Sequence, residues 1–157
     1  MSGIVPARTF QVLDPGRARM DGFCDLSSAQ TAAIYNGYVA AVNSVGAAYL
    51  CDGTDDAYGL FYDHMALEEY PTTDNLTTYL TGERVNIVTG PFEAVCATFM
   101  FTGGTAPAVG ALLYDDEAGA ISGTTGTNKV GRCVGTESVG GDLTVYRCVF
   151  QFPALVA

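Results

Sequence analysis

Apolar and polar positions alternate with the period of a β-strand over much of this chain. The clearest stretch is residues 81–101, where apolar side chains recur at every second position on either side of a Thr-Gly-Pro sequence, at Val85, Ile87, Phe92 and Ala94. An alternation of period two is typical of half-buried strands, and Gly-Pro pairs mark turns. The pattern therefore predicts two strands joined by a turn at Gly90 and Pro91.

The last strong stretch, residues 144–152, alternates along its whole length. One predicted face is fully apolar and consists of Tyr146, Cys148, Phe150 and Phe152. The other face is mixed and consists of Val145, Arg147, Val149 and Gln151. Successive side chains of a strand point to opposite faces, so this segment is predicted to close a core with its apolar face.

Weaker patterns predict the remaining elements. Residues 27–43 indicate a short helical turn followed by a strand from Tyr38 to Val42, and residues 47–63 have the form of a hairpin around the polar stretch DGTDD. Strands are expected at 111–114 and 129–134, and residues 64–80 are expected to form an irregular surface excursion. We therefore predict an all-β fold with at most one or two short helices.

Residues 1–22 differ from the rest of the chain. They hold three of the seven basic residues, Arg8, Arg17 and Arg19, together with two prolines, and little that would pack a core. We predict an extended N-terminal arm over 1–22 and a single β-rich domain over 23–157. Phe10 gives the arm something to bury, so two interpretations stay open: an arm that lies on a neighbouring subunit or acidic surface, or a frayed terminus.

The overall charge excludes some classes of partner. The chain of 157 residues has a net charge of −10, which repels nucleic acid and anionic membranes. It has no signal-peptide pattern and no apolar run long enough to span a bilayer. Hydrophobic residues make up 48% of the chain and charged ones 15%, so part of the apolar surface is expected to be covered by a partner.

The five cysteines are Cys24, Cys51, Cys96, Cys133 and Cys148, and no two of them are spaced as a CxxC pair. We predict buried, reduced thiols, as expected for a protein made in a reducing cytoplasm. A single disulfide such as Cys133 to Cys148 is the alternative.

No group of residues has the pattern of a catalytic site. His64, the only histidine, has Glu68 four residues later, but no second metal-binding motif accompanies them. Two acidic groups, Asp52, Asp55 and Asp56 and then Asp115, Asp116 and Glu117, are predicted to be solvated turns because neither has the spacing of a calcium loop. We expect no enzyme activity, no metal and no cofactor.

Residues 59–135 carry a resemblance to a known family. The series GLFYD, TGERVNIVTGPFEA, VGALLYDDEAGAIS and KVGRCVG resembles the small β-rich decoration, or cement, proteins of tailed-bacteriophage heads. In that family a Gly-Glu-x-Val-x-Val-x-x-Gly strand leads to a Gly-x-x-Leu-Tyr strand and a Val-Gly-x-Val strand. The matching positions are Gly82, Glu83, Val85, Ile87, Gly90, Gly110, Leu113, Tyr114, Val130, Gly131 and Val134.

The resemblance implies a small antiparallel β-barrel or β-tulip-like domain that serves as a virion structural protein. Such proteins bind the outer surface of the head, usually as a homotrimer, and stabilise the capsid by bridging major capsid subunits. The chain would then be made in the host bacterial cytoplasm and located on the virion, without nucleic-acid or membrane partners. We expect Arg8, Phe10 and Arg17 of the arm to contact the capsid.

Two alternatives remain at this stage. One is a different virion structural role, such as a head-fibre base, a tail component or a head-to-tail joining component. The other is a carbohydrate-binding β-sandwich that uses exposed tyrosines among Tyr35, Tyr38, Tyr49, Tyr58 and Tyr62. The absence of tryptophan counts against the second, because sugar-binding platforms favour large flat aromatic rings.

Overall fold

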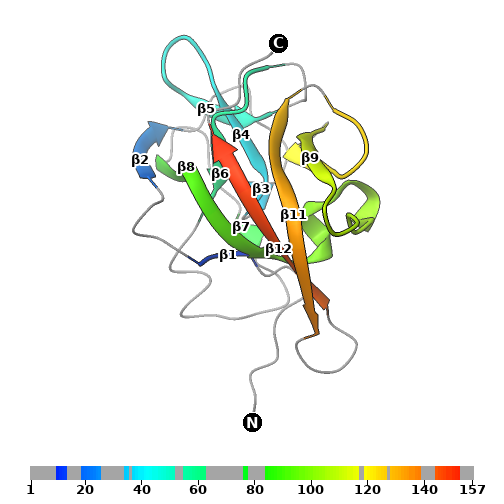
Figure 1. Cartoon of the computed structure of the whole chain (residues 1–157). Coiled ribbons are helices and arrows are strands. Elements are labelled where there is room, and N and C mark those ends of the chain that lie inside the picture. The colour runs from blue at the N-terminus through cyan, green and yellow to red at the C-terminus, as the bar shows by residue number, and fades with distance from the viewer. Residues whose placement is uncertain are drawn as a thin grey trace.

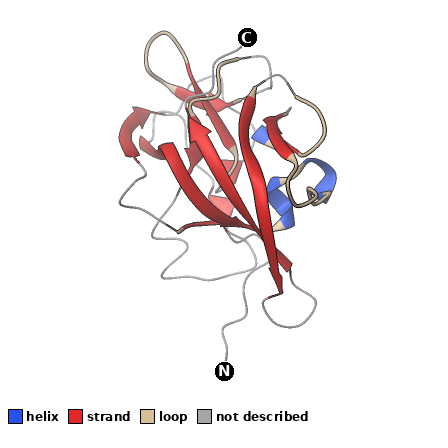
Figure 2. Ribbon diagram, in the orientation of Figure 1, coloured by secondary structure: helices blue, strands red, loops and turns tan. Residues whose placement is uncertain are grey.

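The structure is a computed structural model of the chain. It describes residues 10–13, 19–25, 34–35, 37–51, 55–62, 76–77, 84–116, 119–126, 128–138 and 144–152. In this part of the chain nearly all regular structure is strand, as Figure 2 shows, and the helical elements are short 3-10 turns, among them η1 (Thr98–Met100) and η2 (Thr102–Gly104). The predicted all-β fold is confirmed.

Eight strands form one curled antiparallel sheet, a half-barrel, in the order β10-β9-β11-β12-β8-β6-β4-β5. Figure 1 shows β8, β12, β11 and β9 following one another across the molecule. Two further strands, β1 and β2, also pair with β8, while β3 and β7 form a separate pair. The bounds are β1 Phe10–Val12, β2 Arg19–Asp25, β3 Ile34–Tyr35, β4 Val39–Val42, β5 Ala48–Leu50, β6 Gly59–Phe61, β7 Leu76–Thr77, β8 Arg84–Cys96, β9 Leu112–Asp115, β10 Ile121–Ser122, β11 Lys129–Ser138 and β12 Thr144–Phe152.

The predicted turn at Gly90 and Pro91 is wrong, because β8 is one continuous strand of 13 residues. Gly90 has a φ of +80°, and Pro91 has no N–H group to donate to a neighbouring strand. The strand is therefore irregular at these two residues, but the chain does not reverse there. The first half of β8 pairs with β2 and β6, and the second half pairs with β1 and β12. One strand thereby connects the two parts of the curled sheet.

The main core lies against one face of this sheet. Val88, Phe92, Ala94 and Cys96, all at even positions of β8, are buried in it. Phe92 lies 5.4 Å from Phe150 and 6.2 Å from Phe152 between ring centroids. Ile87, at an odd position, belongs to a second buried cluster with Phe61, so β8 is buried on both faces at residues 87–89. Farther along β8 the odd positions are not covered in this way: Glu93 and Val95 are half-buried.

The strand expected at 38–42 is confirmed as β4, but the hairpin expected within 47–63 is wrong. β5 and β6 are not neighbours, because β4 pairs with both of them. The tight connection lies instead between β4 and β5, where Asn43 Oδ1 accepts hydrogen bonds from the N–H groups of Val45 (3.1 Å) and Ala47 (3.0 Å). An Asn side chain that holds its own turn in this way is an alternative to the Asp-Gly chemistry that the sequence offers in DGTDD.

The C-terminal strands agree well with their predictions. β12 has the predicted bounds, with Cys148, Phe150 and Phe152 buried and Arg147, Val149 and Gln151 exposed. The exception is Val145, which is buried although it lies on the predicted outer face. β11 begins where expected and runs four residues farther, and β9 extends one residue beyond its predicted end, to Asp115.

Two described segments of the predicted arm are strands of the same sheet. Phe10–Val12 pair with 94–96 of β8, and Arg19–Asp25 pair with 84–89. The predicted boundary between residues 22 and 23 falls inside β2. Residues 1–9 and 14–18 lie outside the described residues, so the contacts expected of Arg8 and Arg17 stay a prediction.

Candidate functional site

The outward side of the second half of β8, of β12 and of β11 forms a surface that we call the exterior face. It consists of Leu13, Glu93, Val95, Arg132, Val134, Arg147, Val149 and Gln151. Arg132 of β11 lies opposite Val149 of β12, which in turn lies opposite Glu93 of β8. The N–H of Leu13 donates to the carbonyl of Glu93 at 2.8 Å. Because directly opposed residues share a face, these side chains form a row across the sheet.

Exposed aliphatic side chains gather on this face. Among the described residues five large hydrophobic side chains are exposed, and three of them, Leu13 (41%), Val134 (44%) and Val149 (42%), belong to the exterior face. A fourth, Val109 (59%), lies beside it, because the next residue, Gly110, donates its N–H to the carbonyl of Cys133. Single exposed apolar residues are ordinary on protein surfaces, whereas a group of them on one face marks an interaction site.

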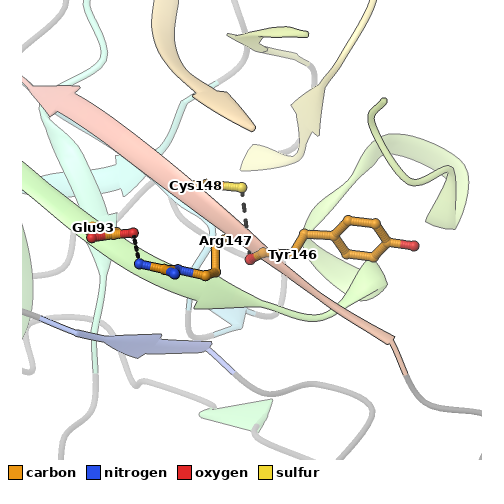
Figure 3. Close-up of polar contacts among 4 residues, drawn as sticks. All are labelled: Glu93, Tyr146, Arg147 and Cys148. Carbon is orange, nitrogen blue, oxygen red and sulfur yellow. Dashed lines mark hydrogen bonds and ion pairs between the residues drawn. The ribbon is translucent and has the colours of Figure 1, made fainter. Parts of the chain in front are cut away.

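Guanidinium groups accompany the aliphatic side chains. Arg147 and Glu93 form an ion pair between β12 and β8. In Figure 3 these two side chains point toward each other, while Cys148 leaves β12 on the other side of the strand. Arg132 Nη1 donates to the carbonyl of Gly110 at 2.7 Å. In a chain of net charge −10, the exterior face therefore combines apolar area with positive charge, a combination that is frequent at the centre of protein interfaces.

A buried polar network closes the gap between the two ends of the sheet. Asp115, at the end of β9, is fully buried and accepts two hydrogen bonds from Asn128: from the main-chain N–H at 2.8 Å and from Nδ2 at 2.6 Å. Cys51, which follows β5, donates its thiol to Asp115 Oδ2 at 3.3 Å. Asn128 Nδ2 also donates to the main-chain carbonyl of Asp55 at 2.8 Å. The network joins the β9 and β11 end of the half-barrel to the segment between β5 and β6.

The prediction that Asp115 belongs to a solvated turn is wrong. Because β9 runs one residue longer than predicted, strand alternation puts Asp115 on the same buried side as Leu113. Asp55 is half-buried and its Oδ2 accepts the hydroxyl of Tyr49 at 2.8 Å, whereas Asp56 is exposed as predicted. The donors around Asp115 are N–H and S–H groups, which stabilise a carboxylate without a cation. We therefore assign the network a structural role.

Four of the cysteines, Cys51, Cys96, Cys133 and Cys148, are buried and carry no disulfide, as predicted. Cys133 and Cys148 are directly opposed on β11 and β12. A hydrogen bond with the Cys96 thiol, together with burial, raises the pKa of Cys148 far above its ordinary value. Burial and the neighbouring Cys148 raise the pKa of Cys133 to about 11. Both thiols are therefore protonated and poorly nucleophilic at neutral pH.

The structure does not form the predicted tyrosine platform for the tyrosines that it describes fully. Tyr49 and Tyr62 pack against the main core, and Tyr38 and Tyr58 pack against the second cluster. His64 lies outside the described residues. Within the described ranges, no three His, Cys, Asp or Glu side chains are placed to hold a metal ion, and no helix has the length and hydropathy needed to cross a membrane.

Sequence reasoning placed the contact residues on the arm and missed the exterior face. The signal was present in 144–152, where Val149 stands between Arg147 and Gln151 on the face predicted to be exposed. The neighbours that complete the face come from β8 and β11, and only the strand order brings them beside β12. Comparisons with protein-family models, with curated proteins and with solved structures find no match to this chain.

Proposed function

We propose that this chain is a virion structural protein that binds the outer surface of a tailed-bacteriophage head and stabilises it by bridging major capsid subunits. The observation that carries the proposal is the exterior face, where Leu13, Val134 and Val149 are exposed beside Arg132 and Arg147. A sheet face of this composition gains free energy when a partner covers it. The resemblance of residues 59–135 to head decoration proteins indicates which partner that is.

The charge distribution suits a contact of this kind. The −10 charge disfavours the DNA-facing side of a shell, where phosphates would repel the chain. The exterior face holds two of the seven basic residues, Arg132 and Arg147, and one acidic residue, Glu93, so it carries a net positive charge on an acidic chain. Positive charge at this place favours an acidic partner. We expect the capsid surface opposite this face to combine aliphatic side chains with carboxylates.

The half-barrel supports a clamping mechanism. Strands β8, β11 and β12 are long and extensively paired, so the exterior face is a stiff platform that loses little conformational entropy on binding. A bound copy that touches two capsid subunits links them, and many weak contacts of this kind add up through effective concentration. The arm residues Arg8, Phe10 and Arg17 remain predicted second contacts, and homotrimer formation remains part of the proposal.

The test is co-sedimentation of the purified chain with heads assembled without it. Val149→Glu puts a carboxylate in the centre of the exterior face, and we expect it to weaken binding at least tenfold. Thr136→Glu is the matched control. Thr136 lies on β11 and is exposed, as Val149 is on β12, but it lies opposite Tyr146 and outside the exterior face. Equal binding of the two variants would refute the assignment of the face, and failure of the unmodified chain to bind would refute the function.

The arm is tested separately in the same assay. Charge reversal at Arg8 and Arg17 leaves β1, β2 and β8 unchanged in sequence and removes the positive charge of the predicted arm contacts. If the arm contacts the capsid, this variant binds less tightly than the unmodified chain. If binding is unchanged, the arm hypothesis fails while the exterior face is still tested by Val149→Glu.

A further inference from the structure

A hollow of about 540 Å³ lies at the edge of the half-barrel, apart from the exterior face. Its walls come from the segment that contains η2 and the following loop to Ala111, and from Asp116 and residues 121–125 around β10. Figure 2 shows the two 3-10 turns beside β9 at this edge. The volume is within the usual range of small-molecule sites.

Hydroxyl groups dominate the polar part of the lining. They belong to Thr102, Thr105, Ser122, Thr124 and Thr125, and the only charged side chain among the lining residues is Asp116. Ala108, which is exposed, and Ala106 and Ala111, which are half-buried, add apolar contact area. Without a cationic group the lining does not suit phosphates or carboxylates. It suits a neutral ligand that brings several hydroxyl groups and an apolar C–H face.

Several polar groups in the hollow are held in fixed positions. Thr102 Oγ1 donates its hydrogen to Asp116 Oδ2 at 2.8 Å, so the Thr102 hydroxyl can act only as an acceptor toward a ligand. Ser122 Oγ accepts the N–H groups of Thr124 and Thr125, each at 3.2 Å, and lies 3.2 Å from Thr124 Oγ1. Groups oriented before binding lose less entropy when a ligand arrives.

Glycines fix the shape of the wall. A Cβ on Gly123 would come within 2.9 Å of Pro107 Cβ, and a Cβ on Gly126 would come within 2.3 Å of Tyr114 Cβ. At the opposite wall Gly103 and Gly104 turn the chain with φ values of +66° and +69°. A side chain at Gly123 would therefore clash with Pro107, which also lines the hollow.

We propose that this hollow binds a saccharide through a pyranose ring, with vicinal hydroxyls at Asp116 and the threonines and the C–H face of the ring against Ala106, Ala108 and Ala111. The same chemistry is offered by a free sugar and by the terminal residue of a polysaccharide. This inference does not depend on the exterior face. A virion protein with both features would bind the capsid through the exterior face and a glycan through the hollow.

The experiment is ligand-observed NMR on the full chain with a panel of monosaccharides, followed by an array of bacterial polysaccharides. We expect at least one sugar to bind with a dissociation constant on the order of 1 mM, as is usual for a ligand of this size. Ala108→Trp fills the hollow and should abolish the signal, and Asp116→Asn should weaken binding at least fivefold. Val109→Trp is the matched control, since Val109 is exposed beside Ala108 but does not line the hollow.

Thermal unfolding of the Ala108→Trp and Val109→Trp variants shows whether both fold. Binding to monosaccharides or to polysaccharides alone supports the proposal and identifies the source of the ring. Two outcomes would overturn it: no binding to either panel, or binding that Ala108→Trp leaves unchanged.

Discussion

Replacing Asp115 with alanine tests how the two ends of the half-barrel are held together. The carboxylate is fully buried and accepts hydrogen bonds from two N–H groups of Asn128 and from the thiol of Cys51. Asp115→Ala leaves these donors in a buried site without their acceptor. The segment after β5 would then be joined to the β9 end by two remaining bonds, from the Gly119 N–H to the Cys51 carbonyl and from Asn128 Nδ2 to the Asp55 carbonyl, each 2.8 Å long.

The expected magnitude follows from the number of donors. A buried donor without a partner costs about 1–3 kcal/mol, and two N–H groups and one weaker S–H group are affected. Removal of the buried carboxylate returns part of that cost, because its own desolvation disappears. We expect a loss of about 3 kcal/mol in the free energy of unfolding, which lowers Tm by roughly 6–12 °C for a domain of this size.

The assay is urea unfolding followed by tyrosine fluorescence, with Tm from calorimetry. Asp116→Ala is the control, because this adjacent carboxylate is half-buried and accepts the Thr102 hydroxyl at the edge of the hollow. We expect it to cost less than about 1 kcal/mol. If Asp115→Ala and Asp116→Ala lower the free energy of unfolding equally, the network does not close the half-barrel.

Two further results are expected. Gly59→Ala should lower the free energy of unfolding by about 2–4 kcal/mol, because a Cβ there would come within 2.4 Å of the Val88 carbonyl. Gly135→Ala is the control and should be nearly neutral, because there is open space around Gly135. Equal urea midpoints for the two variants would contradict the packing of β6 on β8. The raised pKa of Cys133, about 11 in the fold against 9.0, keeps its thiol protonated, so its contribution to stability is full below pH 9 and is lost as the pH rises through about 11. Urea midpoints at pH 8 and pH 10.5 should therefore fall less in Cys133→Ala than in the unmodified chain, and an equal fall in both would contradict the assignment.

The sequence predicts the elements whose signal is local and long. β12 was predicted with its bounds and nearly all of its facing, because nine residues alternate without interruption. The Gly90-Pro91 pair shows the limit of this reasoning. Gly and Pro occur both in turns and at points where one long strand changes its partner strands. At Gly90 and Pro91 the chain continues as one strand because β2 pairs with β8 before this point and β12 pairs with it after.

The candidate sites could be predicted only in part. Asp115 was placed in a turn because the predicted strand stopped at Tyr114, and the extension by one residue depends on the pairing of Asp115 with Ile121 of β10. The exterior face needs β8 beside β12, and the hollow needs η2 beside β10. Neither proximity has a local signal, because the segments are far apart in the chain.

The most direct test of the proposed function is a cryo-electron microscopy map of heads that carry the bound chain. The account predicts density on the outer surface, with β8, β11 and β12 against the capsid and Val149 in the contact. A chain that is absent from the head, that lies inside the shell, or that is bound with the exterior face toward solvent would contradict it.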